Sequence, residues 1–412
     1  MLHSCRSQSR IAFCAAGLAL VAVVALCVLG CSKLLTTKPT PGERFDQPLD
    51  GLSNGELGDF QDGHTQFRKA FTIDEGLGPI FNNVSCASCH SGDGRGVPEN
   101  TLLRFSRGTD LDYAEGGPQL QDKAVPGAIP ERLPPGVDVS YRLPPPVFGV
   151  GLIEAIPDSA IAAGEDPSDV NADGISGRVN WVTPPAYLPA DDPGGGTGPR
   201  AGRFGRKASV SSLVQQVTEA YHQDMGITSP FRPTENVNPL APAAAGADRA
   251  ADPEVSDAKI HDIAQYMRML APPSPGAMTA ARERGQTLFS AAGCAKCHTP
   301  VMHTGPHEIE ALANRDVTLY SDLLIHDLGD ALADNRPDGS ADGHEWRTAP
   351  LWGLRIAREF LGGRLLLLHD GRAHSVDEAV RLHGGEAAAA RDAYLVMRTD
   401  DKAALVDFVE SR

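Results

Sequence analysis

The string Cys-x-x-Cys-His occurs twice in this sequence, at residues 86–90 and 294–298. Two cysteines one helical turn apart can form thioether bonds to both vinyl groups of a haem, and the histidine that follows then lies under the iron as its axial ligand. The alternative is a zinc or thioredoxin-like site beside a chance histidine. A zinc site would need further ligands, and the chain has no spare cysteine to supply them. The sequence therefore predicts two covalently bound c-type haems, with His90 and His298 as iron ligands.

The first 31 residues have the features of an export signal. Arg6 and Arg10 precede an apolar run over residues 11–29, and a small residue stands directly before Cys31. This pattern is typical of a bacterial lipoprotein signal, whose cleavage leaves Cys31 as the lipidated first residue. An uncleaved membrane-spanning anchor is the alternative. We expect residues 32–45 to form a tether, with the body on the periplasmic side of a bacterial membrane, the outer membrane being favoured.

The cysteine count supports the use of the thiols for haem. The chain has eight cysteines. Four form the two pairs: Cys86, Cys89, Cys294 and Cys297. The others lie within or at the end of the signal: Cys5, Cys14, Cys27 and Cys31. None is left for a disulfide framework, so the thiols of this exported chain must have another use.

The chain is acidic, with a formal net charge of −16. Residues 1–31 contain two arginines and no acids, so their removal would change the net charge to −18. Such a surface repels nucleic acid, which we exclude as a partner, and favours a basic redox protein. Simple solubility is the alternative explanation of the charge.

The elements that must position the two motifs are predicted to be mainly α-helical. With 43 glycines and 32 prolines, we expect two cytochrome c-like haem domains, at residues 46–275 and 276–412, with long loop insertions in the first. The proline-rich segment 271–276 marks the boundary between them. Helical spacing and helix ends predict three helices: Ser209–His222, Asp257–Leu270 and Thr279–Ala291.

Several longer strings resemble a known family, the dihaem oxidoreductases. They cover residues 81–90, 144–157, 224–230, 322–329, 345–353 and 368–373. That family is distantly similar to the bacterial dihaem cytochrome c peroxidases and to the enzyme that matures methylamine dehydrogenase. In those relatives the N-terminal haem meets peroxide and the C-terminal haem stores or relays an electron. The resemblance thus implies a peroxidase-like enzyme. The tryptophan between their haems has no counterpart near Phe204, and we interpret Trp181, Trp346 and Trp352 as core residues.

The resemblance also implies ligands for the C-terminal haem. In the peroxidases a segment like His369-Asp370-Gly371 precedes a short helix that supplies a distal ligand, usually Met. Here His383 falls at that position, and imidazole in place of a thioether would lower the reduction potential. A surface histidine is the alternative, and Met302 and Met397 are competing ligands. We expect Arg347, His326 and His369 to act on the haem through its propionates or through hydrogen bonds on the proximal side.

The N-terminal haem of a peroxidase needs an open position and a group that takes a proton from one peroxide oxygen and returns it to the other. Our candidates are Glu154, Gln216 and Asp224. A structural role as loop-capping acids is the alternative for both carboxylates. If His64 or His222 instead closes the site as a sixth ligand, the peroxidase interpretation weakens.

Residues 169–174 fit the pattern Asp-x-Asn-x-Asp-Gly of a calcium loop, with Asn180 at the twelfth place. The ligands would be Asp169, Asn171 and Asp173. The twelfth residue is not the usual bidentate glutamate. A metal-free turn stabilised by its own Asp and Asn side chains is the alternative.

Three functions remain open from the sequence. The first is a dihaem oxidoreductase that uses hydrogen peroxide and a redox partner protein. The second is a non-catalytic, membrane-tethered electron-transfer cytochrome, and the third is a redox helper of a metal-uptake system. The coordination of the first haem separates them, because an open iron favours catalysis and two strong axial ligands favour electron transfer.

Overall fold

A computed structural model describes residues 44–92 and 94–412. The export signal, Cys31 and nearly all of the tether lie outside these residues, so those predictions stay predictions. The described residues form one compact unit, and the predicted division at residue 275 stays a prediction. No helix in the described part of the chain is long and apolar enough to cross a bilayer.

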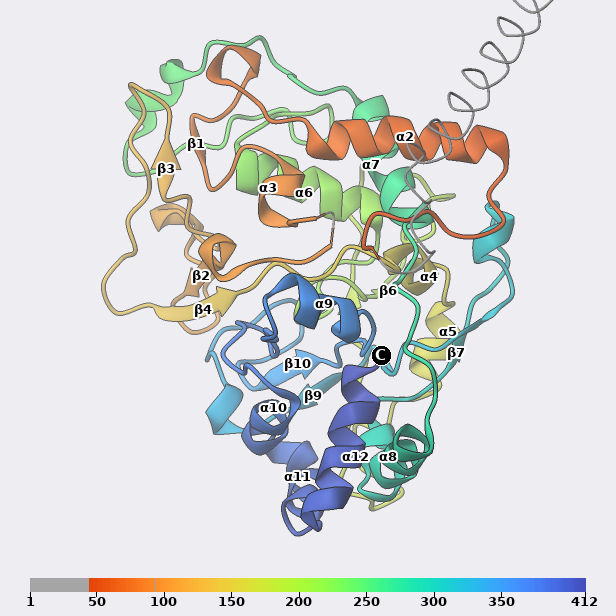
Figure 1. Ribbon diagram of the computed structural model, residues 1–412. Coiled ribbons are helices and arrows are strands. Elements are labelled where there is room, and N and C mark those ends of the chain that lie inside the picture. The colour runs from red at the N-terminus through yellow and green to blue at the C-terminus, as the bar shows by residue number, and fades with distance from the viewer. Residues whose placement is uncertain (1–43, 93) are drawn as a thin grey trace, which may run out of the picture. The chain divides into compact units, whose positions relative to one another are not determined.

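The architecture is mostly helical with small sheets, as expected. In the first part of the chain the α-helices are α2 (Asn54–Arg68), α3 (Cys86–Cys89), α4 (Val150–Glu154), α5 (Asp158–Ala162), α6 (Leu213–Met225) and α7 (Asp257–Met269). The later ones are α8 (Ala280–Ala291), α9 (Leu354–Phe360), α10 (Val376–Leu382), α11 (Ala388–Leu395) and α12 (Thr399–Glu410). Figure 1 shows α2, α6 and α7 gathered around the first motif, and α8, α10, α11 and α12 in a second group.

Short 3₁₀ helices punctuate the connections: Ile73–Glu75, Pro98–Asn100, Tyr113–Glu115, Pro242–Ala247, Cys294–Lys296, Glu310–Leu312, Asp330–Leu332 and Gly385–Ala387. The described strands form five two-stranded antiparallel sheets. The pairs are β1 (Ile80–Phe81) with β3 (Lys123–Ala124), β2 (Leu102–Ser106) with β4 (Asp138–Arg142), β5 (Trp181–Val182) with β6 (Arg200–Ala201), β7 (Met302–His303) with β8 (Asp316–Val317), and β9 (Ile325–Asp327) with β10 (Glu345–Arg347).

In each group, two helices pack with their backbones in close contact at a glycine. Gly63 of α2 lies against the carbonyl of Asp262 on α7, where a Cβ atom would collide with it. Aromatic rings fill the rest of that contact, with the centroids of Phe60 and Tyr266 4.9 Å apart. In the second group Gly285 of α8 lies equally close to α12. Each motif is therefore held against a tightly packed helix pair.

The three helices expected from sequence are present as α6, α7 and α8, although α6 spans Leu213–Met225 and so begins and ends later than the predicted Ser209–His222. The start of α8 agrees closely, because the Thr279 side chain accepts a hydrogen bond from the amide of Arg282 and caps the helix. The two parts of the chain are joined by backbone hydrogen bonds. Arg178 and Ile325 exchange two of them, at 3.2 and 2.9 Å, and one hydrophobic core contains residues of both parts.

Candidate functional site

Both Cys-x-x-Cys-His motifs line one cavity of about 830 Å³. This volume is at the upper end of the roughly 300–1,000 Å³ that is usual for ligand pockets. Most of the lining side chains are apolar, and a smaller number of histidines, arginines and acids face the same space. A large flat apolar cofactor with a few charged groups matches this lining.

The first motif is a single helical turn. Cys86–Cys89 form α3, the Ser85 hydroxyl caps it by accepting from the Ser88 amide at 3.0 Å, and the His90 amide donates to the Cys86 carbonyl at 2.9 Å. Both cysteines are free thiols. Burial lowers the pKa of His90 to about 4. The nearby Pro145 carbonyl opposes this lowering of the pKa. The Nδ1 atom of His90 is buried and has no hydrogen-bond partner of normal geometry. His90 is therefore a neutral imidazole, the form that binds a metal.

The second motif repeats this geometry with a tighter turn. Cys294–Lys296 form a 3₁₀ helix, and the His298 amide donates to the Cys294 carbonyl at 3.0 Å. His298 Nδ1 donates to the Tyr320 carbonyl at 2.9 Å, which fixes the tautomer and leaves Nε2 for a metal. Burial lowers the pKa of His298 to about 4, with a smaller contribution from nearby His383.

Three arginines in the cavity wall test whether a haem fits. Arg95, Arg206 and Arg347 line the cavity, and burial lowers their pKa values to about 10, 9 and 10. Within the described chain none of the three forms an ion pair with a carboxylate. Their hydrogen bonds go to main-chain carbonyls, such as that of Leu143, 2.6 Å from Arg206 Nη2. Buried positive charge without a counterion calls for an anion, and haem propionates supply it. The residues present fit the group.

Of these arginines only Arg347 was expected from sequence. Arg95 and Arg206 stand in loops, and their burial results from contacts with distant segments. Arg206 lies two residues after Phe204, in the region where the tryptophan of the relatives has no counterpart.

His383, the predicted distal ligand of the C-terminal haem, lines the cavity. It follows α10 directly, and its Nδ1 donates to the Ala379 carbonyl at 2.6 Å. Burial lowers the pKa of His383. The ring is therefore neutral, and its Nε2 is available as a metal ligand. His298 has the same arrangement, and the two rings influence each other electrostatically. The competing ligands Met302 and Met397 are not among the described residues that line the cavity.

One face of α6 provides the polar groups near the first motif. Gln216 and Asp224 are eight residues apart on this helix, and both line the cavity. Asp224 raises the pKa values of Cys86 and Cys89 through its charge, after the larger effect of burial. Burial raises the pKa of Asp224 itself to about 6, although Gln119 Nε2 donates to its Oδ1 at 2.6 Å.

Glu154, the other predicted acid, does not line the cavity. Its side chain has no exposed surface. Oε1 accepts from the Leu213 amide at 2.8 Å, and Oε2 accepts from Arg268 Nε at 2.6 Å. Glu154 thus connects the first residue of α6 to α7. This geometry supports the structural alternative, because both oxygens are occupied and neither faces the cavity.

The two histidines considered as sixth ligands of the first haem are also absent from the described lining. His222 lies on α6, and its Nε2 is 3.0 Å from the Thr234 carbonyl. The ring of His64, on α2, lies 5.3 Å from the ring of Tyr266. Neither is placed to close the first site.

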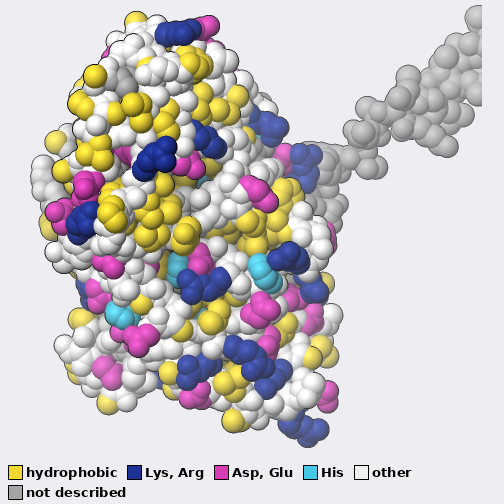
Figure 2. Space-filling view, turned by 90° about the vertical axis from the view of Figure 1, so that its left-hand side faces the viewer, with side chains coloured by type: hydrophobic (Ala, Val, Ile, Leu, Met, Phe, Trp, Pro, Cys, Tyr) yellow, Lys and Arg dark blue, Asp and Glu magenta, His cyan; other side chains and the backbone are white. Residues whose placement is uncertain are grey.

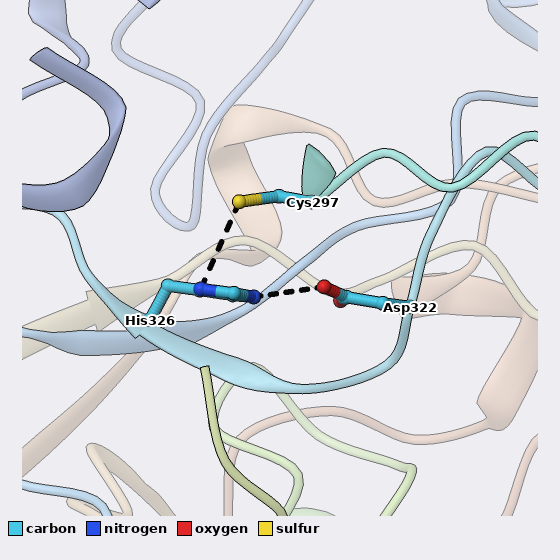
Figure 3. A group of neighbouring side chains, drawn as sticks. All are labelled: Cys297, Asp322 and His326. Atoms are coloured by element: carbon cyan, nitrogen blue, oxygen red, sulfur yellow. Dashed lines mark hydrogen bonds and ion pairs between the residues drawn. The ribbon is translucent and has the colours of Figure 1, made fainter. Parts of the chain in front are cut away.

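A charged cluster surrounds the second motif. His326 is 2 % exposed, and Figure 3 shows its ring between the sulfur of Cys297 and the carboxylate of Asp322. Nε2 lies 2.9 Å from Asp322 Oδ2, and Nδ1 lies 2.7 Å from Glu386 Oε2 and 3.7 Å from Cys297 Sγ. Burial alone would lower the pKa of His326, but its hydrogen bonds to Asp322, Cys297 and Glu386 raise it to about 12.

His326 is consequently an imidazolium that donates from both ring nitrogens. Cys297, Asp322 and His326 are close enough together to hold a metal ion. A thioether bond to haem would occupy the sulfur, however, so this cluster belongs to the haem site.

The comparison with known sequences decides the family. Residues 30–104 and 130–412 match the family described as "Di-haem oxidoreductase, putative peroxidase". The chain belongs to this di-haem oxidoreductase family. No protein of curated function matches the sequence.

Two solved structures are similar over nearly the whole chain. The hydrazine synthase of Kuenenia stuttgartiensis is 14% identical, with a TM-score of 0.38, and the alignment covers 92% of this chain and 97% of that one. A MauG-like protein associated with microbial copper homeostasis is 15% identical, with a TM-score of 0.37 and coverages of 92% and 94%. These likenesses are too low to carry an argument about function.

In this member of the family, the side chains of the predicted calcium loop accept hydrogen bonds from the backbone of the same loop. Asp169 Oδ1 accepts from the Asp173 and Gly174 amides at 2.9 and 3.2 Å, and Asn171 Oδ1 accepts from the Asp173 amide at 2.9 Å. Lys296 Nζ lies 3.2 Å from Asp173 Oδ2. Asn180 does not complete the loop, because its amide hydrogen-bonds distant residues. The geometry supports the metal-free alternative.

Trp181 was interpreted as a core residue, but its side chain is 43% exposed, so that prediction is wrong. Trp346 was interpreted as a core residue, and it is buried, but it also lines the cavity. Its ring is stacked on His369 with a centroid distance of 3.7 Å and an interplanar angle of 4°. Lys207 Nζ and Arg142 Cζ lie 4.5 and 4.8 Å from the Trp346 ring. No sequence spacing links these four residues, so only the fold could reveal the cluster.

Proposed function

We propose that this di-haem oxidoreductase is an exported, peroxidase-like enzyme with two covalently bound haem c groups. The reaction is H₂O₂ + 2 H⁺ + 2 e⁻ → 2 H₂O at the N-terminal haem, with electrons from a redox partner protein entering through the C-terminal haem. When bound, the haems supply the irons that accept and pass on these electrons.

The chain's own groups hold the haems. The helical turns of both motifs present two thiols followed by a neutral histidine. Arg95, Arg206 and Arg347 would bind propionates. His383 would occupy the sixth position at the C-terminal haem, which suits electron transfer better than peroxide binding.

The observation that carries the proposal is Asp224. It lines the cavity beside the first motif with a pKa of about 6, so near neutral pH it can both take and return a proton. Gln119 occupies Oδ1, which leaves Oδ2 as the oxygen that carries the proton. Gln216, on the same face of α6, can orient peroxide through its amide.

Low-temperature EPR of the fully oxidised, haem-loaded protein, with and without peroxide, tests this proposal. We expect one high-spin signal that disappears when peroxide is added, and one low-spin signal. Asp224→Asn should lower peroxide turnover by about 10²-fold or more, while Asp59→Asn, an exposed residue of α2, should not. Unchanged turnover in Asp224→Asn would remove this residue from the mechanism.

The alternative function is a non-catalytic electron-transfer cytochrome that serves a metal-uptake system. The pairing of His383 with His298 favours it at the C-terminal haem. Two low-spin EPR signals that peroxide leaves unchanged, before and after half-reduction, would establish this alternative.

The proposal also includes the location and the partner. A lipid on Cys31 would hold the enzyme at the periplasmic side of a bacterial membrane, with the outer membrane favoured, as the N-terminal pattern suggests. The net charge favours a cationic redox partner. Charges of both signs are interspersed on the face shown in Figure 2, so this preference rests on the total charge.

A further inference from the structure

Four carboxylates converge in the segment between α6 and α7, far from either motif in sequence. Glu235, Asp248, Asp252 and Glu254 each offer one oxygen, and these oxygens all lie within 4.8 Å of one another. Figure 1 draws this segment in green at the top of the view. The residues stand near its two ends, because Glu235 follows α6 and the other three precede α7.

Buried oxygens without partners point to a missing ligand. The Glu235 carboxylate is buried at both oxygens, neither of which keeps 1 Å² of exposed surface or has a hydrogen-bond partner. Glu254 Oε1 is in the same state, while Oε2 accepts from the amide and hydroxyl of Thr228 at 2.7 and 2.6 Å. A buried ionised carboxylate without a donor is strongly destabilising unless it takes up a proton or a cation binds it.

No basic side chain of the described chain supplies that cation. The two arginines nearest in sequence are engaged elsewhere. Arg232 Nε donates to Glu219 at 2.9 Å, and Arg249 Nη1 lies 3.8 Å from Asp74. Burial, the charge of Glu254, a hydrogen bond shared with the Asp252 carboxyl, and the charges of Asp252 and Asp248 raise the pKa of Glu235 to about 9.

We propose that Glu235, Asp248, Asp252 and Glu254 bind one Ca²⁺ ion. Calcium takes oxygen ligands at about 2.3–2.6 Å, so ligands on opposite sides of the ion lie about 4.6–5.2 Å apart, which suits the observed spread. Magnesium requires about 2.0–2.1 Å and a stricter octahedron. Zinc prefers nitrogen and sulfur ligands, which this cluster does not offer.

The position of the ion gives it a structural role. Calcium would connect the chain that leaves α6 with the chain that enters α7. α6 carries Gln216 and Asp224, and α7 contributes Ile263 and Met267 to the cavity wall. The ion would thus hold together two helices of the N-terminal haem site. This inference is independent of the peroxidase proposal.

Calorimetry on the haem-loaded protein tests the site directly. After EDTA treatment and its removal, the protein is titrated with CaCl₂ and separately with MgCl₂ at pH 7. We expect one Ca²⁺ per chain, much weaker Mg²⁺ binding, and a Tm that rises with Ca²⁺ concentration.

Variants locate the ion. Glu235→Gln combined with Asp252→Asn should weaken Ca²⁺ binding at least 100-fold while the haem absorbance per chain is kept. The matched control Asp59→Asn with Asp62→Asn removes two exposed acids of α2 and should bind calcium normally. Asp169→Asn, in the other acidic loop, should also bind normally.

Three results would overturn the inference: no Ca²⁺ uptake by the unmodified protein, equally tight Mg²⁺ binding, or loss of binding in Asp169→Asn rather than in the cluster variant. If the cluster variant fails to fold, the Ca²⁺ stoichiometry of the unmodified protein, its selectivity over Mg²⁺ and the binding by Asp169→Asn decide.

Discussion

The Nδ1 atom of His326 lies 2.7 Å from the Glu386 carboxylate, which connects two segments 60 residues apart beside the second haem motif. Glu386 also accepts from the amide and hydroxyl of Ser176, both at 2.9 Å. One carboxylate therefore joins β9, the segment after His383, and a loop of the first part of the chain. Five predictions concern this cluster and the cavity beside it.

His326→Gln should strongly destabilise the protein. The substitution removes a buried cation and leaves Asp322 and Glu386 as uncompensated buried charges, which costs about 3–5 kcal/mol in comparable pairs. Thermal unfolding of the haem-loaded protein measures the loss, with His303→Gln as the exposed control. Equal Tm values for the two variants would show that the cluster contributes little.

The raised pKa of His326 predicts that the stability of the protein depends on pH. The pKa of His326 is about 12 in the folded protein and about 6.5 when unfolded. The stabilisation is therefore complete below pH 6.5 and is lost progressively as pH rises towards 12. Comparing the free energies of unfolding at pH 7 and 9 should show a decline in the native protein that is absent in His326→Gln.

Glu386→Gln should loosen the predicted axial ligand His383. Two glycines, Gly384 and Gly385, separate these residues, so the Glu386 hydrogen bonds restrain a segment that would otherwise be flexible. We expect part of the low-spin EPR signal of the C-terminal haem to become high-spin, while Glu359→Gln, at an exposed position of α9, leaves it unchanged. If His383→Gly alters that signal and Glu386→Gln does not, the restraint lies elsewhere.

Peroxide turnover should depend on the ionisation of Asp224. Its carboxylate takes the proton, so the rate should rise with pH through about 6 and level off near neutrality. The turnover rate of Asp224→Asn should not show this rise with pH, and Asp224→Glu should restore the rise in part. A profile that is identical in native protein and Asp224→Asn would assign the proton transfer to another group.

Arg206→Gln should lower the reduction potential of a haem. A buried positive charge stabilises the state that holds one more electron, and a tenfold change in that equilibrium is roughly 60 mV for one electron. Potentiometric titration measures the shift, and exposed Arg315→Gln serves as the control. An unchanged potential would place Arg206 away from the propionates.

What the sequence alone determined about this protein is local. The two haem motifs could be recognised because one helical turn fixes the spacing of cysteines and histidine, and α6, α7 and α8 could be located from helical spacing and prolines. Long matching strings gave the family correctly. His383 and Asp224 were named from that resemblance, and the cavity contains both.

The tertiary structure decided which charged residues meet. Glu154 is bound to Arg268 more than a hundred residues away, and the carboxylates of Glu235 and Glu254 converge although no motif connects them. The sequence left a calcium loop and a metal-free turn open at Asp169, and in the structure the Asp169 carboxylate accepts hydrogen bonds from the backbone of its own loop. Such pairings depend on distances between remote segments, and periodicity and spacing describe only neighbours along the chain.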